Sequence, residues 1–112
     1  MVVTSFIEKP WGSEELLEKN EFYVLKKLTM NAGHQCSLQY HNQKHETVYV
    51  LEGELHLFFE DKWRICSPGD VVVIPPKAVH RMKAVEEKAV YLESSTTQLD
   101  DVVRIEDDYR KI

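Results

Sequence analysis

Four residues of this chain have the types and spacing of a metal site: Gln39, His41, Glu46 and His80. Gln39 and His41 are two positions apart, so in a β-strand their side chains leave the same face. Four residues separate His41 from Glu46, which is enough for a turn that brings the next strand alongside. His80 follows a valine-rich stretch that ends in two prolines. Two imidazoles, a carboxylate and an amide oxygen suit zinc, manganese, iron or cobalt.

The segments that must position these side chains are short and rich in β-branched and aromatic residues. Turn signals such as Gly53 separate them, and this pattern predicts an all-β sandwich or barrel. We expect strands over residues 22–30, 37–41, 46–51, 54–60, 63–66, 71–74, 80–85 and 88–95. Residues 14–19 are too few for an independent helix, and residues 100–109 fit either a short helix or a terminal strand.

Lys26 is the one charged residue on the face of its predicted strand that also carries Phe22, Val24, Leu28 and Met30. Two interpretations stay open. Directed into the barrel near a metal, the amine would be desolvated and would serve as a base or a phosphate ligand. If the strand twists or lies at an edge, the amine reaches water instead.

Other alternating positions predict what lies on the outside of the barrel. Tyr49 and Leu51 lie opposite Glu46 on their strand, and an outward apolar stripe of this kind predicts either a homodimer or cover by the N-terminal segment. Arg81 and Lys83 alternate with His80, so we expect them on a solvated face. The two tryptophans, at positions 11 and 63, are expected to be core or covering residues.

The length and composition are those of one globular domain, 112 residues with 43% hydrophobic and 29% charged residues. We assign residues 1–112 to it, with an N-terminal arm over 1–20 and a C-terminal segment over 96–112 that packs on the barrel. A formal net charge of −5 disfavours nucleic acid and anionic membranes as partners. Cys36 and Cys66 are predicted to be free thiols, and the absence of a leader or membrane span predicts a cytoplasmic protein.

Five residues have a spacing that resembles the first cupin motif: Gly33, Gln39, His41, Glu46 and Gly53. Gln39 stands where that motif has its first His. Gly69, Pro75 and His80 resemble the second cupin motif, in which Lys77 stands at a family glycine. This resemblance implies a cupin double-stranded β-helix, or jelly-roll barrel. It also implies one divalent metal, with zinc favoured over manganese, cobalt, nickel or iron.

Four stretches resemble the C-terminal isomerase domain of type II phosphomannose isomerases: Lys9–Gly12 (K-P-W-G), Ser37–His41 (S-L-Q-Y-H), Ile74–Arg81 and Leu99–Tyr109. The resemblance implies interconversion of mannose 6-phosphate and fructose 6-phosphate, with Arg104 and Lys26 at the active site. Arg110 departs from the family's ending Y-G-R, where a glycine follows the tyrosine, and the nucleotidyltransferase half of the bifunctional enzymes is absent from this sequence.

Such an isomerase moves a proton between C2 and C1 of the sugar, and negative charge builds on the enediol oxygens. A divalent metal and an arginine would stabilise that charge, or the arginine would bind the phosphate. The proton carrier stays open between Lys26, a non-ligand Glu46 and a metal-bound water. The alternatives are a metal-dependent cupin dioxygenase, which Gln39 disfavours because such sites commonly use three histidines, and a non-catalytic sugar-binding cupin.

Overall fold

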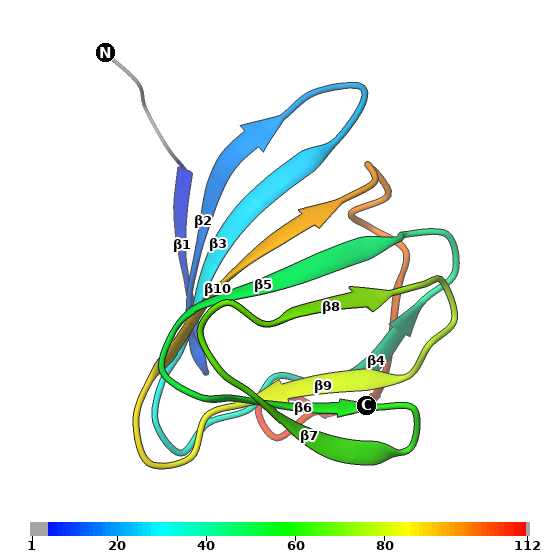
Figure 1. Cartoon of the computed structure of the whole chain (residues 1–112). Helices are drawn as coiled ribbons and strands as arrows, with labels where there is room; N and C mark the ends of the chain where they lie inside the picture. Colours follow the sequence, from blue (N-terminus) through cyan, green and yellow to red (C-terminus); the bar gives the residue numbers. More distant parts are fainter. Residues whose placement is uncertain (1–4, 112) are drawn as a thin grey trace.

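A computed structural model describes residues 5–111, and every regular element in that range is a β-strand. The strands form two antiparallel sheets that face each other (Figure 1). The six-stranded sheet has the order β1 (Ser5–Lys9), β2 (Gly12–Lys19), β3 (Val24–Met30), β10 (Ala89–Ser95), β5 (Glu46–Glu52) and β8 (Val71–Ile74). The five-stranded sheet has the order β11 (Val102–Glu106), β4 (Leu38–His41), β9 (His80–Lys83), β6 (Leu55–Phe59) and β7 (Lys62–Cys66).

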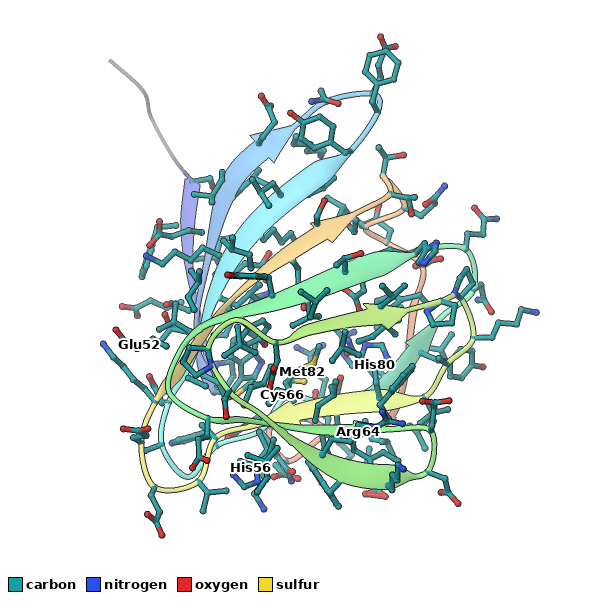
Figure 2. The ribbon with its side chains drawn as sticks, in the orientation of Figure 1. Glu52, His56, Arg64, Cys66, His80 and Met82 are labelled. Carbon is teal, nitrogen blue, oxygen red and sulfur yellow. The ribbon has the colours of Figure 1, made fainter. Side chains whose placement is uncertain are left out.

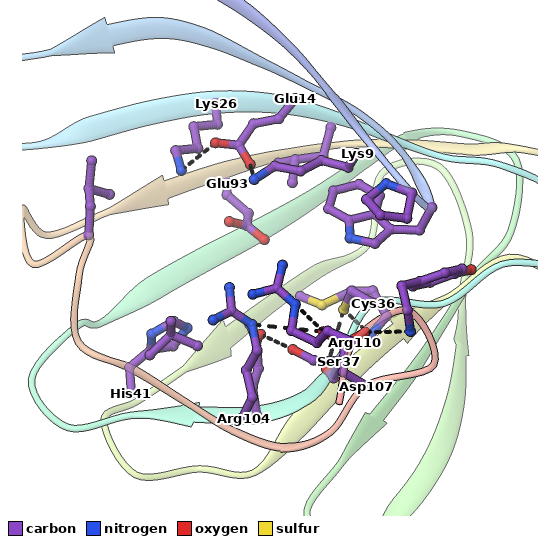
Figure 3. A pocket seen from close by; sticks show the side chains of 18 of the residues that line it. Lys9, Glu14, Lys26, Cys36, Ser37, His41, Glu93, Arg104, Asp107 and Arg110 are labelled. Atoms are coloured by element: carbon purple, nitrogen blue, oxygen red, sulfur yellow. Dashed lines mark hydrogen bonds and ion pairs between the residues drawn. The ribbon is translucent and has the colours of Figure 1, made fainter. Parts of the chain in front are cut away.

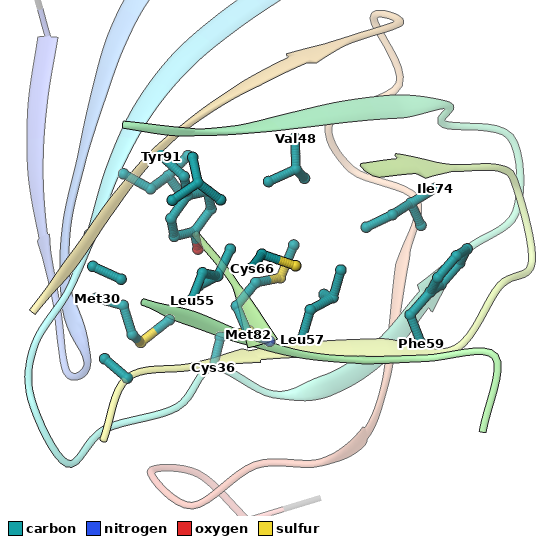
Figure 4. Close-up of a cluster of buried hydrophobic side chains, with 14 residues drawn as sticks. Met30, Cys36, Val48, Leu55, Leu57, Phe59, Cys66, Ile74, Met82 and Tyr91 are labelled. Atoms are coloured by element: carbon teal, nitrogen blue, oxygen red, sulfur yellow. The ribbon is translucent and has the colours of Figure 1, made fainter. Parts of the chain in front are cut away.

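Alternation along the strands builds the core between these sheets. In β5, Val48 and Val50 are buried while Tyr49 between them is exposed, as the two-residue period of a strand requires. The inward side chains of both sheets meet in one cluster (Figure 4). The largest members of the cluster that are fully buried are Met30, Leu55, Leu57, Ile74, Met82 and Tyr91.

The prediction of an all-β jelly roll is confirmed, and both segments that were considered for a helix contain strands. Residues 14–19 lie in β2, which pairs with β3 between Gly12 and Lys19 with a register shift between Leu16 and Glu18. Residues 102–106 form β11, which pairs with β4 and so packs the C-terminal segment on the barrel. Residues 5–19 of the expected N-terminal arm form β1 and β2 at one edge of the six-stranded sheet.

The predicted strand over residues 22–30 was too long at its start. Strand β3 begins at Val24, and Phe22 is 77% exposed in the turn before it. The oxygen of the Asn20 side chain accepts hydrogen bonds from the backbone N–H groups of Phe22 and Tyr23. This local side-chain-to-backbone bonding closes a turn and delays the strand.

The prediction that Arg81 faces solvent was wrong. Its side chain is buried, and its Nε donates to the carbonyl of Cys36 at 2.8 Å. The end of β11 and the chain after it cover this side of β9. Arg81 Nη1 lies 4.0 Å from Glu106 Oε1, and Arg81 Nη2 lies 3.8 Å from Asp108 Oδ1. Alternation alone gave the correct face, but it could not show that a distant segment covers it.

Trp63 is a covering residue and not a core residue: it lies on the edge strand β7, is 48% exposed and packs edge-on against Phe58, with ring centroids 5.5 Å apart. Trp11 packs against the core, as expected.

Both cysteines are free and buried, and burial raises the pKa of the Cys36 thiol to about 12. The described part of the chain contains no helix with the length and apolarity to cross a membrane.

Candidate metal centre and adjoining pocket

Three strands bring together the predicted metal ligands: β4 and β9 of the five-stranded sheet and β5 of the six-stranded sheet. His41 ends β4, Glu46 begins β5 and His80 begins β9, while Gln39 lies opposite His80 in the β4–β9 pairing. The Nε2 atoms of His80 and His41 lie 3.1 Å and 3.8 Å from Glu46 Oε1. One ligand atom from each of these three residues falls within 4.8 Å of the others. Figure 2 shows His80 directed into the space between the sheets.

Hydrogen bonds on the far side of each imidazole decide which nitrogen faces this cluster. The Nδ1 of His80 lies 2.9 Å from the carbonyl of Ala78, and the Nδ1 of His41 lies 3.2 Å from the Asp101 carboxylate. Both acceptors require a proton on Nδ1. The neutral rings therefore present the lone pair of Nε2 toward Glu46.

This arrangement fits a cation. Four buried atoms of the cluster have no hydrogen-bond partner among the described residues: His41 Nε2, His80 Nε2, Glu46 Oε1 and Glu46 Oε2. Two lone pairs aimed at a carboxylate would repel it, and buried polar groups are rarely left unpaired. An ion about 2.0–2.2 Å from each ligand atom would satisfy all of them. The nitrogen and oxygen donors fit a borderline divalent ion such as zinc.

The surrounding charges keep Glu46 ionised. Burial alone would raise its pKa, but His80 and His41, when they carry a proton on Nε2, together with Lys44 outweigh burial and lower the pKa to about 2. Lys44 Nζ lies 3.4 Å from Glu46 Oε2. Burial followed by the Lys44 charge lowers the pKa of His41, which favours the neutral ring that a metal requires.

Gln39 stands on the same strand face as His41 but is already engaged on one side. The Ser37 hydroxyl donates to Gln39 Oε1 at 2.5 Å. An amide oxygen has two lone pairs, so one remains for a further partner. The described structure therefore leaves Gln39 able to act as the fourth ligand, and its role as a ligand stays a prediction.

A pocket of about 210 Å³ adjoins this cluster and is lined by Gln39, His41 and the two predicted catalytic residues, Lys26 and Arg104 (Figure 3). Its walls come from β1–β4, β10, β11 and the chain after β11. Glu46 and His80 lie deeper, at 1% and 0% exposure. The fold thus unites all six residues that the sequence singled out at one end of the barrel.

Lys26 points toward this pocket and is not a solitary amine. Its Nζ lies 2.6 Å from Glu14 Oε1, and Glu14 Oε2 lies 3.9 Å from Lys9 Nζ. The side chain of Lys26 is 17% exposed. Neither open interpretation is complete, because the amine is shielded from water but is paired with a carboxylate of the neighbouring strand.

Sequence reasoning missed four side chains around the site: Lys44, Glu93, Asp101 and Arg110. Glu93 follows buried Tyr91 by two residues, so alternation placed an acid on the inward face. Burial, followed by the Glu46 charge, raises the pKa of Glu93 to about 8. Alternation could not predict the positions of Asp101 and Lys44, because both residues lie outside the strands.

Comparison with known families agrees with the observed fold. A family model described as a cupin domain matches residues 26–95. The chain is 26% identical over 110 residues to mannose-1-phosphate guanylyltransferase ManC of Salmonella typhimurium, covering 95% of this chain and 23% of that protein. It is 28% identical over 107 residues to the alginate biosynthesis protein AlgA of Pseudomonas aeruginosa, covering 92% and 22%.

These curated relatives are much longer proteins, and the chain spans less than a quarter of their length. Among solved structures, the Rru_A2000 cupin-2 domain from Rhodospirillum rubrum superposes with a TM-score of 0.83 at 18% identity, covering 92% of this chain and 76% of that one. A likeness at this identity shows a shared fold.

Proposed function

The chain belongs to the cupin-domain family, and from this premise we propose that it is a metal-dependent isomerase of mannose 6-phosphate and fructose 6-phosphate. One observation carries the proposal: the His41–Glu46–His80 cluster adjoins a pocket that also holds Arg104 and Lys26. The motif resemblance to the isomerase domain of type II phosphomannose isomerases supports the substrate. So does the similarity to proteins named mannose-1-phosphate guanylyltransferase.

The charges of the pocket suit the reaction. A divalent ion held by His41, Glu46, His80 and Gln39 would supply a Lewis acid that needs no change of oxidation state. Arg104 reaches the same pocket from β11 and would interact with negative charge on the substrate. Lys26, held by Glu14, adds a second fixed cation on the opposite side.

The reaction also needs a group that carries a proton between C2 and C1. Glu93 lines the pocket and joins the candidates that the sequence left open. Its pKa of about 8 leaves both protonation states populated near neutral pH, which suits a general acid or base. Lys26 Nζ is engaged by Glu14 Oε1 at 2.6 Å, so Glu93 is the better placed proton carrier of the two.

The test is a coupled assay of the purified protein with mannose 6-phosphate and a panel of divalent metals. We expect Arg104→Ala to lower kcat/KM by about 100-fold or more, because it removes a charge partner of the substrate. His80→Ala should lose the bound metal, measured by elemental analysis, while the circular dichroism spectrum persists. Arg64→Ala, on β7 outside the pocket, is the matched control and should keep full activity.

The assay also separates the alternatives. Oxygen consumption with bound iron and no isomerisation would favour a cupin dioxygenase. Sugar binding without turnover, unaffected by Arg104→Ala, would favour a non-catalytic sugar-binding cupin. An isomerase whose rate does not change in Arg104→Ala would remove this arginine from the mechanism.

A further inference from the structure

Two arginines of the C-terminal segment form one wall of the pocket. Arg104 lies in β11, and Arg110 lies in the chain that follows it. Between them is the nearly buried carboxylate of Asp107, whose Oδ2 lies 3.0 Å from Arg110 Nε and 4.0 Å from Arg104 Nε. Figure 3 shows the two side chains beside each other, with Lys9 and Lys26 on the opposite side of the pocket.

The printed approach of Asp107 to each guanidinium group is at Nε. Within residues 5–111, the Nη atoms of these two arginines form no hydrogen bond. A guanidinium carries five N–H donors, four of them on Nη. Two such groups held by one carboxylate leave one net positive charge and several N–H donors at the pocket wall.

The pocket as a whole has the same sign of charge. Including the two arginines and Asp107, five cationic side chains line it against three carboxyl groups, although the whole chain has a formal net charge of −5. The two lysines on the opposite side share the single carboxylate of Glu14. A positive cleft in an acidic protein concentrates anions locally.

Arg110 is also a feature of this chain in particular. The ending of the resembled isomerase domain has a glycine after its tyrosine, whereas this chain has Tyr109-Arg110-Lys111. In this chain the residue directly after the tyrosine is an arginine, and it lines the same pocket as Arg104. Hydrogen bonds hold Tyr109 in place, since its hydroxyl lies 2.6 Å from His34 Nδ1 and its N–H donates to Asp107 at 2.9 Å.

We propose that Arg110, paired with Arg104, binds the phosphate group of the substrate and is a specificity-determining residue of this pocket. The inference rests on the proposed function for the identity of the sugar but not for the binding of phosphate. Two guanidinium groups can each donate two parallel hydrogen bonds to phosphate oxygens, a geometry that a single lysine cannot reproduce.

The test is isothermal titration of the metal-loaded full chain with three probes: inorganic phosphate, mannose 6-phosphate and mannose. Arg110→Gly, which restores the family residue, should weaken the binding of inorganic phosphate and of mannose 6-phosphate by about 10-fold or more. Arg110→Met, which keeps the aliphatic stem, should lose as much. Mannose affinity and metal content should stay unchanged in both variants.

Lys111→Gly is the matched control, because Lys111 is an exposed neighbour of equal charge outside the pocket. It should change phosphate affinity by less than about twofold. Equal phosphate affinity in wild type, Arg110→Gly and Arg110→Met would overturn the inference. Binding of phosphate at the metal alone would overturn it too.

The outcome is separable from that of the proposed isomerase. Phosphate binding that depends on Arg110, without turnover of mannose 6-phosphate, would uphold this inference and reject the substrate or the reaction. Turnover with a KM unaffected by Arg110→Gly would uphold the isomerase and reject the phosphate site.

Discussion

Asp101 is the residue that fixes the orientation of His41. Its Oδ1 lies 3.2 Å from His41 Nδ1, and its Oδ2 accepts the backbone N–H groups of Gln43 at 2.6 Å and Lys44 at 3.0 Å. Burial opposes the charged form of Asp101, but these hydrogen bonds and His41 outweigh it and lower its pKa. The carboxylate therefore stays ionised and holds the imidazole with Nε2 toward Glu46, as the outer partners of metal-binding histidines commonly do.

We expect Asp101→Ala to weaken metal binding by about 10- to 100-fold, because the ring loses its fixed tautomer and orientation. The measurement is the metal Kd by competition with a chromogenic chelator, which does not depend on any activity. Asp100→Ala is the control, since Asp100 is an exposed neighbour of the same charge. An equal loss of metal affinity in the two variants would show that only the local negative charge matters, and would reject the positioning role.

At the scale of the elements, the turn between β5 and β6 needs glycine for two reasons. Gly53 has a φ of +73°, in the left-handed region that L-residues rarely adopt. A Cβ there would also lie 2.1 Å from the carbonyl oxygen of Lys88. Gly69, in the turn before β8, has a φ of +94°, but a Cβ added there would meet no heavy atom within 4 Å. The close approach at Gly53 fixes β5, which carries Glu46, against the turn before β10.

These two glycines give a matched pair of substitutions. We expect Gly53→Ala to lower the free energy of unfolding by about 2–4 kcal/mol, through backbone strain and a backbone clash. Gly69→Ala should lower it by only about 1 kcal/mol, through strain alone. Urea unfolding followed by circular dichroism measures both. A similar loss at the two positions would mean that the Lys88 contact relaxes freely.

At the scale of the whole molecule, an apolar surface remains on the outer face of the six-stranded sheet. Tyr49, Leu51, Val71 and Val73 are between 40% and 56% exposed on β5 and β8, and Tyr49 pairs with Val71 across the strands. The predicted outward direction of Tyr49 and Leu51 is confirmed. β1 and β2 lie at the opposite edge of this sheet, so the described part of the N-terminal segment does not cover the stripe.

The homodimer stays a prediction, and this surface is where we expect it. Tyr49→Lys should convert the dimer to a monomer, because a charge at the centre of an apolar interface is costly to desolvate. Sedimentation equilibrium measures the change. Ile65→Lys, at a residue 61% exposed on β7 in the other sheet, is the control and should stay dimeric. A monomeric wild type at tens of micromolar would reject the prediction.

Local patterns in the sequence predicted the strands from β3 to β10 and the candidate ligands, but not β1 and β2. Two-residue alternation gave the inward face of β5, and the spacing of Gln39, His41, Glu46 and His80 identified residues that the fold does bring together. These predictions succeeded because strand direction and turn chemistry depend on neighbouring residues.

Only the tertiary structure decided what lies against each face. It paired Asp101 with His41, covered Arg81 with the chain after β11, and placed Arg110 beside Arg104 at one pocket wall. Asp101 is 60 positions from His41 along the chain, and β-strand pairing across such distances leaves no periodic trace in the sequence. The charge and shape of the pocket come from these long-range contacts, so they could be read only from the folded chain.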